Sequence, residues 1–200
     1  MTSFVEKIEG VERSLAAAAV PHAFGGALAL AFCVGDPRAT ADIDVNVFVT
    51  TEEVERVFAA LPRGVVTNAT AARLARRDGQ VRVWWDDTPV DLFFSYHDLH
   101  DEAARRARRV SFGELQIPVL SCTDLAVFKV VFNRTRDWAD LEAMSDAGSY
   151  DHADALGWLE GTLGAEAEPV QRFATLGDRR PETEPSLRRL LGRSDPPASP

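Results

Sequence analysis

Two segments, Phe24-Gly25-Gly26-Ala27-Leu28 and Thr40-Ala41-Asp42-Ile43-Asp44-Val45, decide the fold that this chain is expected to adopt. A glycine pair lets backbone amides approach an anion, and the N-terminus of a following helix favours negative charge. Side chains two residues apart in a strand point to the same face, so the two aspartates repel each other unless a cation lies between them. Together the segments predict a divalent-metal site that holds a nucleoside triphosphate.

Hydrophobic periodicity and turn residues predict the elements around this motif. A strand at 22–26, a helix at 27–33 and a strand at 43–49 frame it. The other expected elements are helices at 4–19, 52–61 and 68–79, a hairpin of strands 81–85 and 90–95 with its turn at 86–89, strands at 110–112 and 115–120, and helices at 122–133, 136–144 and 151–163. The first helix begins with a capping box, Ser3 and Glu6.

This order of elements predicts an α+β fold, a mixed β-sheet flanked by helices with a C-terminal helical bundle. We expect an α/β core at 1–120, a helical region packed on it at 121–180, and a proline-rich tail at 181–200 that is poorly ordered. The chain has 200 residues, of which 46% are hydrophobic and 26% charged, a composition typical of one globular unit.

Charge limits the ways in which this chain could bind nucleic acid. A net charge of −9 argues against binding through overall charge, because phosphate contacts need local lysine and arginine. Two arginine clusters, at 73–82 and 105–109, could be functional patches, but solvated helix faces are the favoured interpretation.

The surroundings of the cysteines and an uncharged stretch predict the cellular context. Cys33 and Cys122 both lie in apolar sequence, which favours buried thiols in a reducing compartment over a disulfide. Residues 15–35 carry no charged side chain, but Pro21 and the glycine pair argue against a membrane span. We therefore expect a cytoplasmic protein without a membrane partner.

Three aspartates are candidate metal ligands. Asp42 and Asp44 would lie about 7 Å apart along one strand face, a separation that suits a grip on one or two metal ions. The alternative is an exposed edge strand with an acidic face, which the rarity of aspartate in strands disfavours. Asp91 lies in an otherwise apolar strand, and it either joins them as a third carboxylate or pairs with an arginine. Both interpretations of Asp91 stay open.

Lys129 is one of only two lysines in the chain and lies in an apolar helical run. Its ammonium could extend out to solvent, or it could serve carboxylates and phosphates. On an unbroken helix Asp140 would lie about 16 Å away. A break at 133–135 would instead bring Arg134, Asp137 and Asp140 back towards the lysine. The two aspartates could otherwise be ordinary acids in the first turn of a helix.

These residues together resemble a known family. The pattern Gly25-Gly26, Arg38-x-Thr40-x-Asp42-x-Asp44, Asp124-Leu125 with Lys129, and Arg134-x-x-Asp137-x-x-Asp140-Leu141 is similar to the nucleotidyltransferases of abortive-infection and MenT toxin–antitoxin systems. These enzymes belong to the DNA polymerase β-like superfamily. The resemblance implies the nucleotidyltransferase fold and transfer of a nucleoside monophosphate from a nucleoside triphosphate with Mg²⁺. It also implies an RNA acceptor, typically the 3′ end of tRNA, and a cognate antitoxin.

The resemblance, together with the residue arguments above, assigns expected roles to individual residues. Metal binding falls to Asp42, Asp44 and Asp91, and catalysis to Asp42, Asp44, Lys129 and Asp140; substrate binding falls to Gly25, Gly26, Arg38, Thr40, Arg134 and Asp137. Two departures stand out, because the commoner Gly-Ser is Gly-Gly here and the lysine-to-aspartate spacing is short. Two further interpretations stay open: transfer to a small molecule such as an aminoglycoside, or to a protein, and a non-catalytic module that binds nucleotide or antitoxin.

Overall fold

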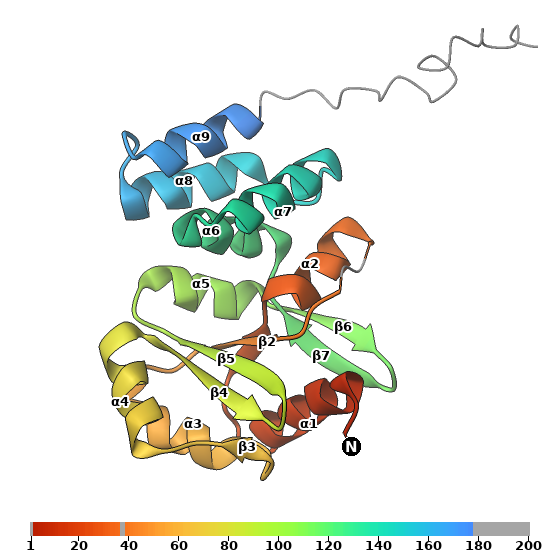
Figure 1. Cartoon of the computed structure of the whole chain (residues 1–200). Helices are drawn as coiled ribbons and strands as arrows, with labels where there is room; N and C mark the ends of the chain where they lie inside the picture. The colour runs from red at the N-terminus through yellow and green to blue at the C-terminus, as the bar shows by residue number, and fades with distance from the viewer. Residues whose placement is uncertain (1, 37–38, 178–200) are drawn as a thin grey trace, which may run out of the picture.

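A computed structural model describes residues 2–36 and 39–177 of the chain (Figure 1). Its elements are, in order, α1 (Phe4–Ala17), β1 (His22–Phe24), α2 (Gly26–Val34), β2 (Ile43–Val47), the 3₁₀ turn η1 (Thr51–Glu53), α3 (Val54–Ala60), β3 (Val65–Val66), α4 (Ala69–Asp78), β4 (Gln80–Trp85), β5 (Thr88–Phe94), α5 (Asp98–Arg106), β6 (Arg108–Phe112), β7 (Leu115–Val119), α6 (Cys122–Phe132), α7 (Thr135–Asp146), α8 (His152–Leu163) and α9 (Glu168–Leu176).

The strands form one mixed sheet in the order β3-β4-β5-β2-β1-β7-β6. The pairs β2–β5 and β1–β7 are parallel, whereas the other neighbouring pairs are antiparallel. Helices α1, α3 and α4 lie on one side of the sheet, and α2 and α5 on the other, with α6–α9 stacked beyond them (Figure 1). The expected α+β fold with a mixed sheet and a C-terminal helical bundle is confirmed.

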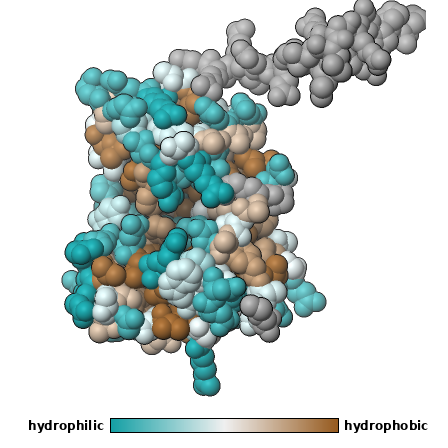
Figure 2. Space-filling view, viewed as in Figure 1, coloured by the Kyte–Doolittle hydropathy of each residue, from teal (hydrophilic) through white to brown (hydrophobic). Residues whose placement is uncertain are grey.

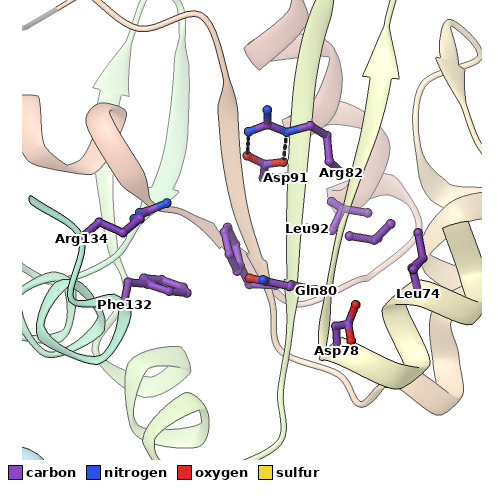
Figure 3. Close-up of a pocket in the computed structure, with 10 residues that line it drawn as sticks. Leu74, Asp78, Gln80, Arg82, Asp91, Leu92, Phe132 and Arg134 are labelled. Carbon is purple, nitrogen blue, oxygen red and sulfur yellow. Dashed lines mark hydrogen bonds and ion pairs between the residues drawn. The ribbon is translucent and has the colours of Figure 1, made fainter. Parts of the chain in front are cut away.

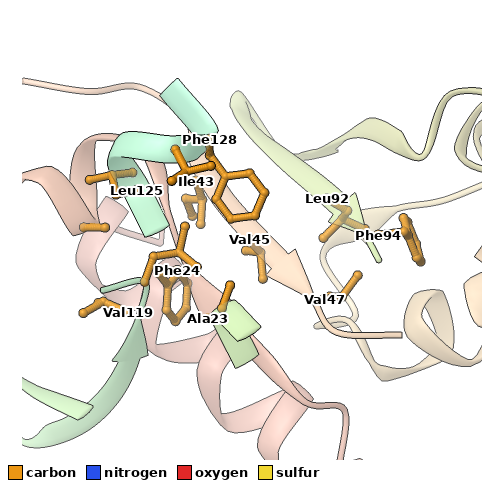
Figure 4. Packing of buried hydrophobic residues seen from close by; sticks show 14 of the residues in the cluster. Ala23, Phe24, Ile43, Val45, Val47, Leu92, Phe94, Val119, Leu125 and Phe128 are labelled. Carbon is orange, nitrogen blue, oxygen red and sulfur yellow. The ribbon is translucent and has the colours of Figure 1, made fainter. Parts of the chain in front are cut away.

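The core joins the centre of the sheet to the first C-terminal helix. Phe24 of β1 and Val45 of β2 are fully buried, and Leu125 and Phe128 of α6 belong to the same buried cluster but lie on the other face of the sheet, beside Asn46 (Figure 4). Alternation in β2 sends Ile43, Val45 and Val47 to one face and leaves the other face to polar side chains. Helix α2 contacts both β2 and α6, so the apolar packing of α2 helps to position α6 over the sheet.

Local sequence signals explain most of the element boundaries. The capping box of Ser3 and Glu6 is present at the start of α1, and Asn68 caps α4 as expected. The elements that the sequence analysis missed are short or polar: β3, α5 and α9. Residue 121 as a domain boundary stays a prediction, and the expected disorder at 181–200 lies outside the described residues.

The β4–β5 turn is tighter than expected, and a buried lysine holds it. Asp86 and Asp87 alone form the turn, and Asp86 takes a left-handed conformation with φ 52°. Lys7 of α1 donates hydrogen bonds to the Trp85 carbonyl at 3.0 Å, to Thr88 Oγ1 at 2.9 Å and to Asp87 Oδ1 at 3.1 Å. The first lysine of the chain therefore fixes the register of this hairpin.

The prediction of free thiols at Cys33 and Cys122 is wrong in this structure, because the two residues form a disulfide with a Cα–Cα distance of 5.6 Å. Their apolar surroundings are real, since both pack against the core, but these surroundings belong to two helices in contact, α2 and α6. Sequence alone could not show that the two cysteines are neighbours. The bond ties the glycine-pair helix to the helix that carries Lys129.

Hydrophilic side chains predominate on the face of the molecule that Figure 2 shows. Figure 2 shows hydrophobic side chains as separate small patches on one face rather than as one continuous area. Within 2–36 and 39–177, no helix has the length and apolar character that a membrane crossing requires. Nothing on this face indicates an extended apolar interaction surface.

We expect Cys33→Ser to lower the free energy of unfolding by about 2–4 kcal/mol, because the bond closes a loop between residues 89 positions apart in sequence. Urea unfolding under non-reducing conditions measures this difference. The Cys33→Ser/Cys122→Ser double variant should lose little more than either single variant, since all three lack the same bond. Equal stability of the unmodified and variant proteins would contradict a disulfide in solution.

Candidate active site

A row of charged side chains crosses three neighbouring strands. In the register of the sheet, Arg82 of β4 pairs with Asp91 of β5, and Asp91 pairs with Asp44 of β2. Paired residues point to the same face of a sheet. Strand pairing therefore places two carboxylates and a guanidinium side by side on the face that α2 and α6 cover, as the sequence analysis allowed for Asp91.

The glycine pair lies directly over this row. The Gly25 amide donates to the Asp44 carbonyl at 2.9 Å, and α2 begins at Gly26, which has φ +50°. A Cβ atom on Gly26 would lie 1.8 Å from Asp44 Oδ2. Only glycine lets the helix N-terminus approach the carboxylate this closely. The expected placement of a helix N-terminus at an anionic site is thus present in the backbone.

The environment of Asp44 disfavours the ionised form of its carboxyl group. Burial, followed by the neighbouring carboxylates of Asp42 and Asp91, raises the pKa of Asp44 to about 7, and Arg134 and Lys129 only partly oppose these effects. Within the described residues, no hydrogen bond or salt bridge reaches the Asp44 carboxylate. Asp42, one residue before β2, instead accepts a hydrogen bond from Thr40 Oγ1 at 2.5 Å.

The lysine of α6 reaches the aspartates of α7 because the chain turns between the two helices. Asn133 adopts a left-handed conformation with φ 52° and ends α6, as the expected break at 133–135 requires. Lys129 Nζ then lies 2.6 Å from Asp140 Oδ2 and 3.5 Å from Asp137 Oδ1, and all three residues are buried. Arg134 Nε donates to Asp137 at 2.7 Å. These groups form one network beside the strand carboxylates.

Asp91 is engaged by an arginine that the sequence analysis assigned to a solvated cluster. Arg82 donates two parallel hydrogen bonds to Asp91, at 2.7 and 2.6 Å, and lies 3.7 Å from Asp42 (Figure 3). The hydrogen bonds to Asp91 raise the pKa of Arg82 above its ordinary value, so the guanidinium is permanently charged. The pairing of Asp91 with an arginine is therefore observed, and Asp91 also lies beside Asp44, while its role as a third metal carboxylate stays a prediction.

A polar cavity of about 160 Å³ collects most of these side chains. It is lined by Gly26, Ala27, Asp42, Asp44, Arg82, Asp91, Lys129, Arg134, Arg136 and Asp137. Of the other candidates, Gly25 caps α2, Thr40 bonds Asp42 and Asp140 bonds Lys129. Arg38 lies outside the described residues. Arg82 and Arg136 were not among the predicted site residues.

The donor set suits a hard divalent cation. Carboxylate oxygens are the ligands that Mg²⁺ prefers, and Asp44 is a partly buried carboxylate that no described side chain neutralises through a direct bond. In the residues described, however, no three Asp, Glu, His or Cys side chains already have the arrangement of a metal-ligand set. Asp42 and Asp44 therefore fit a bound cation, whereas the third carboxylate, Asp91, is paired with the guanidinium of Arg82.

Comparison with known proteins places the chain in a family. The model of the family described as "Nucleotidyl transferase AbiEii toxin, Type IV TA system" matches residues 11–191. The chain belongs to this family. It is therefore a nucleotidyltransferase and the toxin of a type IV toxin–antitoxin system, and the family implies a nucleotide substrate and an antitoxin partner. The comparison with curated proteins gives no match.

Solved structures show the same fold as this AbiEii family member. The antibiotic-resistance factor ANT(2'')-Ia superposes with a TM-score of 0.55 at 13% identity, over 87% of this chain and 95% of that chain. An antigenic nucleotidyltransferase-like protein from Paracoccidioides brasiliensis has a TM-score of 0.50 at 13% identity, over 94% of each chain. The expected nucleotidyltransferase fold is confirmed.

We expect Gly26→Ala to lower the free energy of unfolding by about 1–3 kcal/mol. The added Cβ atom would collide with Asp44, and the alanine residue would have to adopt a positive φ. Gly157→Ala in α8 is the matched control, since nothing lies within 4 Å of its Cβ and alanine favours a helix interior by up to about 1 kcal/mol. Urea unfolding compares the two variants. Equal stability of both would contradict the close approach of α2 to Asp44.

We expect the metal-free protein to lose stability as the pH rises from about 4 to about 7. The pKa of Asp44 is about 7 in the folded chain against 3.8 for a free side chain, so over this window the folded state keeps a proton that the unfolded state releases. The Asp44→Asn variant lacks this part of the pH dependence. The difference in free energy of unfolding between the variant and the unmodified protein should therefore be more favourable to the variant at pH 8 than at pH 4. Urea unfolding at both pH values, in the presence of a chelator, tests this. Parallel profiles would contradict the raised pKa.

Proposed function

We propose that the protein transfers a nucleoside monophosphate from a nucleoside triphosphate, with Mg²⁺, to an RNA acceptor, and that the acceptor is the 3′ end of tRNA. One observation carries the proposal: the Asp42, Asp44 and Asp91 carboxylates converge beneath the N-terminus of α2 in the same polar cavity as Lys129. Carboxylates that hold cations beside groups that hold phosphates are what phosphoryl-transfer sites require.

The proposal gives each side of the cavity a task. Asp42 and Asp44 would hold Mg²⁺, and the bound ion would neutralise the charge that develops on the reacting phosphate oxygens. The N-terminus of α2 at Gly26 would face the triphosphate, because its free amides and dipole favour an anion. Lys129 and Arg134 would bind phosphate oxygens from the opposite side, held in place by Asp140 and Asp137.

In the transfer step, an acceptor hydroxyl oxygen bonds to the α-phosphorus, and the bond from this phosphorus to the leaving pyrophosphate breaks. The hydroxyl proton passes to a carboxylate, and Asp91 is the one that lines both the polar cavity and a larger cavity next to it. The larger cavity, of about 470 Å³, is the space available to the acceptor. A nucleotide at the end of an RNA chain fits a cavity of this size class.

Arginine side chains in both cavities would provide contacts for a phosphate-bearing acceptor. Arg82 and Arg134 line both cavities, and Arg136 lines the smaller one without an ion pair to any described residue. These arginines would attract a phosphate only at short range, and salt screens most of the repulsion that the net charge of −9 exerts from farther away.

Radiolabelled nucleoside triphosphates, incubated one at a time with Mg²⁺, total tRNA and the protein, test this function. We expect label in tRNA, and a loss of about a hundredfold or more in rate for Asp42→Ala. Asp146→Ala, which removes an exposed carboxylate at the end of α7, is the matched control and should keep the rate of the unmodified protein. Expression of Asp42→Ala should also relieve growth inhibition.

The other outcomes separate the alternatives. Label in a protein or in an added aminoglycoside, with none in tRNA, would replace the RNA acceptor by another class and keep the chemistry. Nucleotide binding without any transfer would overturn the catalytic proposal and leave a binding module. An Asp42→Ala variant that is as toxic as the unmodified protein would remove Asp42 from the site.

A further inference from the structure

The Arg82–Asp91 pair occupies the position where a cation would otherwise be needed. Arg82 donates two parallel hydrogen bonds to Asp91. The Asp91 side chain is only 16% exposed, whereas the Arg82 side chain is 50% exposed. The guanidinium also reaches to 3.7 Å from Asp42. An internal cation therefore partly neutralises two of the three carboxylates that converge at the site.

The same pair separates two cavities. Arg82, Asp91 and Arg134 line both the polar cavity of about 160 Å³ and the neighbouring cavity of about 470 Å³. In Figure 3, Arg134 and Phe132 face Gln80 and Leu74 across the larger cavity, and the hydrogen-bonded pair stands at one end of it. An acceptor in the larger cavity must approach the reacting phosphate past this pair.

We propose that Arg82 is an exchangeable counter-ion: it holds Asp91 in the empty site, releases it when a divalent cation binds, and then binds a phosphate of the acceptor in the larger cavity. The inference rests on the proposed function, and it assigns Arg82 to acceptor binding and therefore to selection of a phosphate-bearing acceptor. Arg82 would be a substrate-binding residue, since it touches the acceptor rather than the reacting atoms.

Three features support this exchange. Each oxygen of Asp91 accepts one hydrogen bond from Arg82, and the guanidinium charge beside them opposes the approach of a divalent cation or a proton, so opening the pair favours the proposed chemistry. An arginine that is half exposed gives up a carboxylate at small cost, because water solvates it once it is free. Its backbone is fixed by the β4–β5 ladder, so the freed guanidinium stays at the wall of the larger cavity, where its fork matches a phosphate.

The first arm of the test needs no acceptor. Mn²⁺ alone is titrated into the full chain and followed by electron paramagnetic resonance for the unmodified protein, Arg82→Gln and Arg77→Gln. Arg77 is the matched control, because it grips Asp78 through two hydrogen bonds of 2.7 Å but does not line either cavity. We expect Arg82→Gln to bind Mn²⁺ about two- to fivefold more tightly, the range expected when an exposed competing ion pair is removed. Arg77→Gln should bind as the unmodified protein does.

The second arm measures transfer to tRNA. Arg82→Gln should raise KM for tRNA about tenfold, the effect of losing a charge-assisted phosphate contact, and change KM for the nucleoside triphosphate less than about twofold. Arg82→Lys keeps the charge and should recover part of the loss. A purely structural role would move both KM values together, and thermal unfolding of each variant checks that the fold is retained.

Each arm can overturn the inference by itself. Unchanged or weaker Mn²⁺ binding by Arg82→Gln would show that the arginine does not compete with the cation. Unchanged KM for tRNA would remove Arg82 from acceptor binding. If the unmodified protein labels no RNA, the proposed function fails, and the Mn²⁺ titration still decides whether Arg82 is an exchangeable counter-ion.

Discussion

Repulsion among neighbouring carboxylates is the constraint around which this structure is built. The register of β2 and β5 puts Asp44 beside Asp91, and Asp42 lies one residue before β2, close enough to raise the pKa of Asp44. Positive charge comes from four parts of the chain: β4, α6, the connection between α6 and α7, and α7 itself. One of these parts belongs to the sheet and three belong to the helical region, and the charges of Arg134 and Lys129 act on Asp44 from that region by lowering its pKa. The packing of α6 against α2 and α7 places Lys129 and Arg134 beside the carboxylates of the sheet.

The sequence was sufficient for elements whose signals are local. Alternation predicted β2, and the glycine pair predicted where α2 begins, because both depend on neighbouring residues. Arg82 was missed for a physical reason, namely the length of one turn. A four-residue turn at 86–89 pairs Trp85 with Val90 and puts Arg82 opposite Phe93. The actual two-residue turn pairs Trp85 with Thr88 and puts Arg82 opposite Asp91. Lys7, from a helix distant in sequence, stabilises that turn, so local signals did not reveal it.

Helix geometry could suggest some of the contacts between distant segments from the sequence, but not others. Lys129 and Asp140 are too far apart on a straight helix, so their pairing required a break, and Asn133 supplies it. The disulfide offered no such argument, because apolar surroundings suit a buried thiol and a buried disulfide equally. Its formation depends on how α2 and α6 pack, which is a property of the whole fold. The family pattern pointed to the candidate site because it combines residues from all of these levels.

The charge distribution of the chain bears on how an acceptor would be recognised. A net charge of −9 repels RNA at long range, so attraction would be confined to the cavity mouth, where Arg82, Arg134 and Arg136 gather. A protein that contacts only one or two phosphates gains little from counterion release, and its binding would depend weakly on salt. Such a site is suited to the end of a nucleic acid rather than to its length, because an extended contact would bring more phosphates against acidic surface. Under the proposed function, the acidity of the chain would therefore restrict RNA binding to a terminal nucleotide.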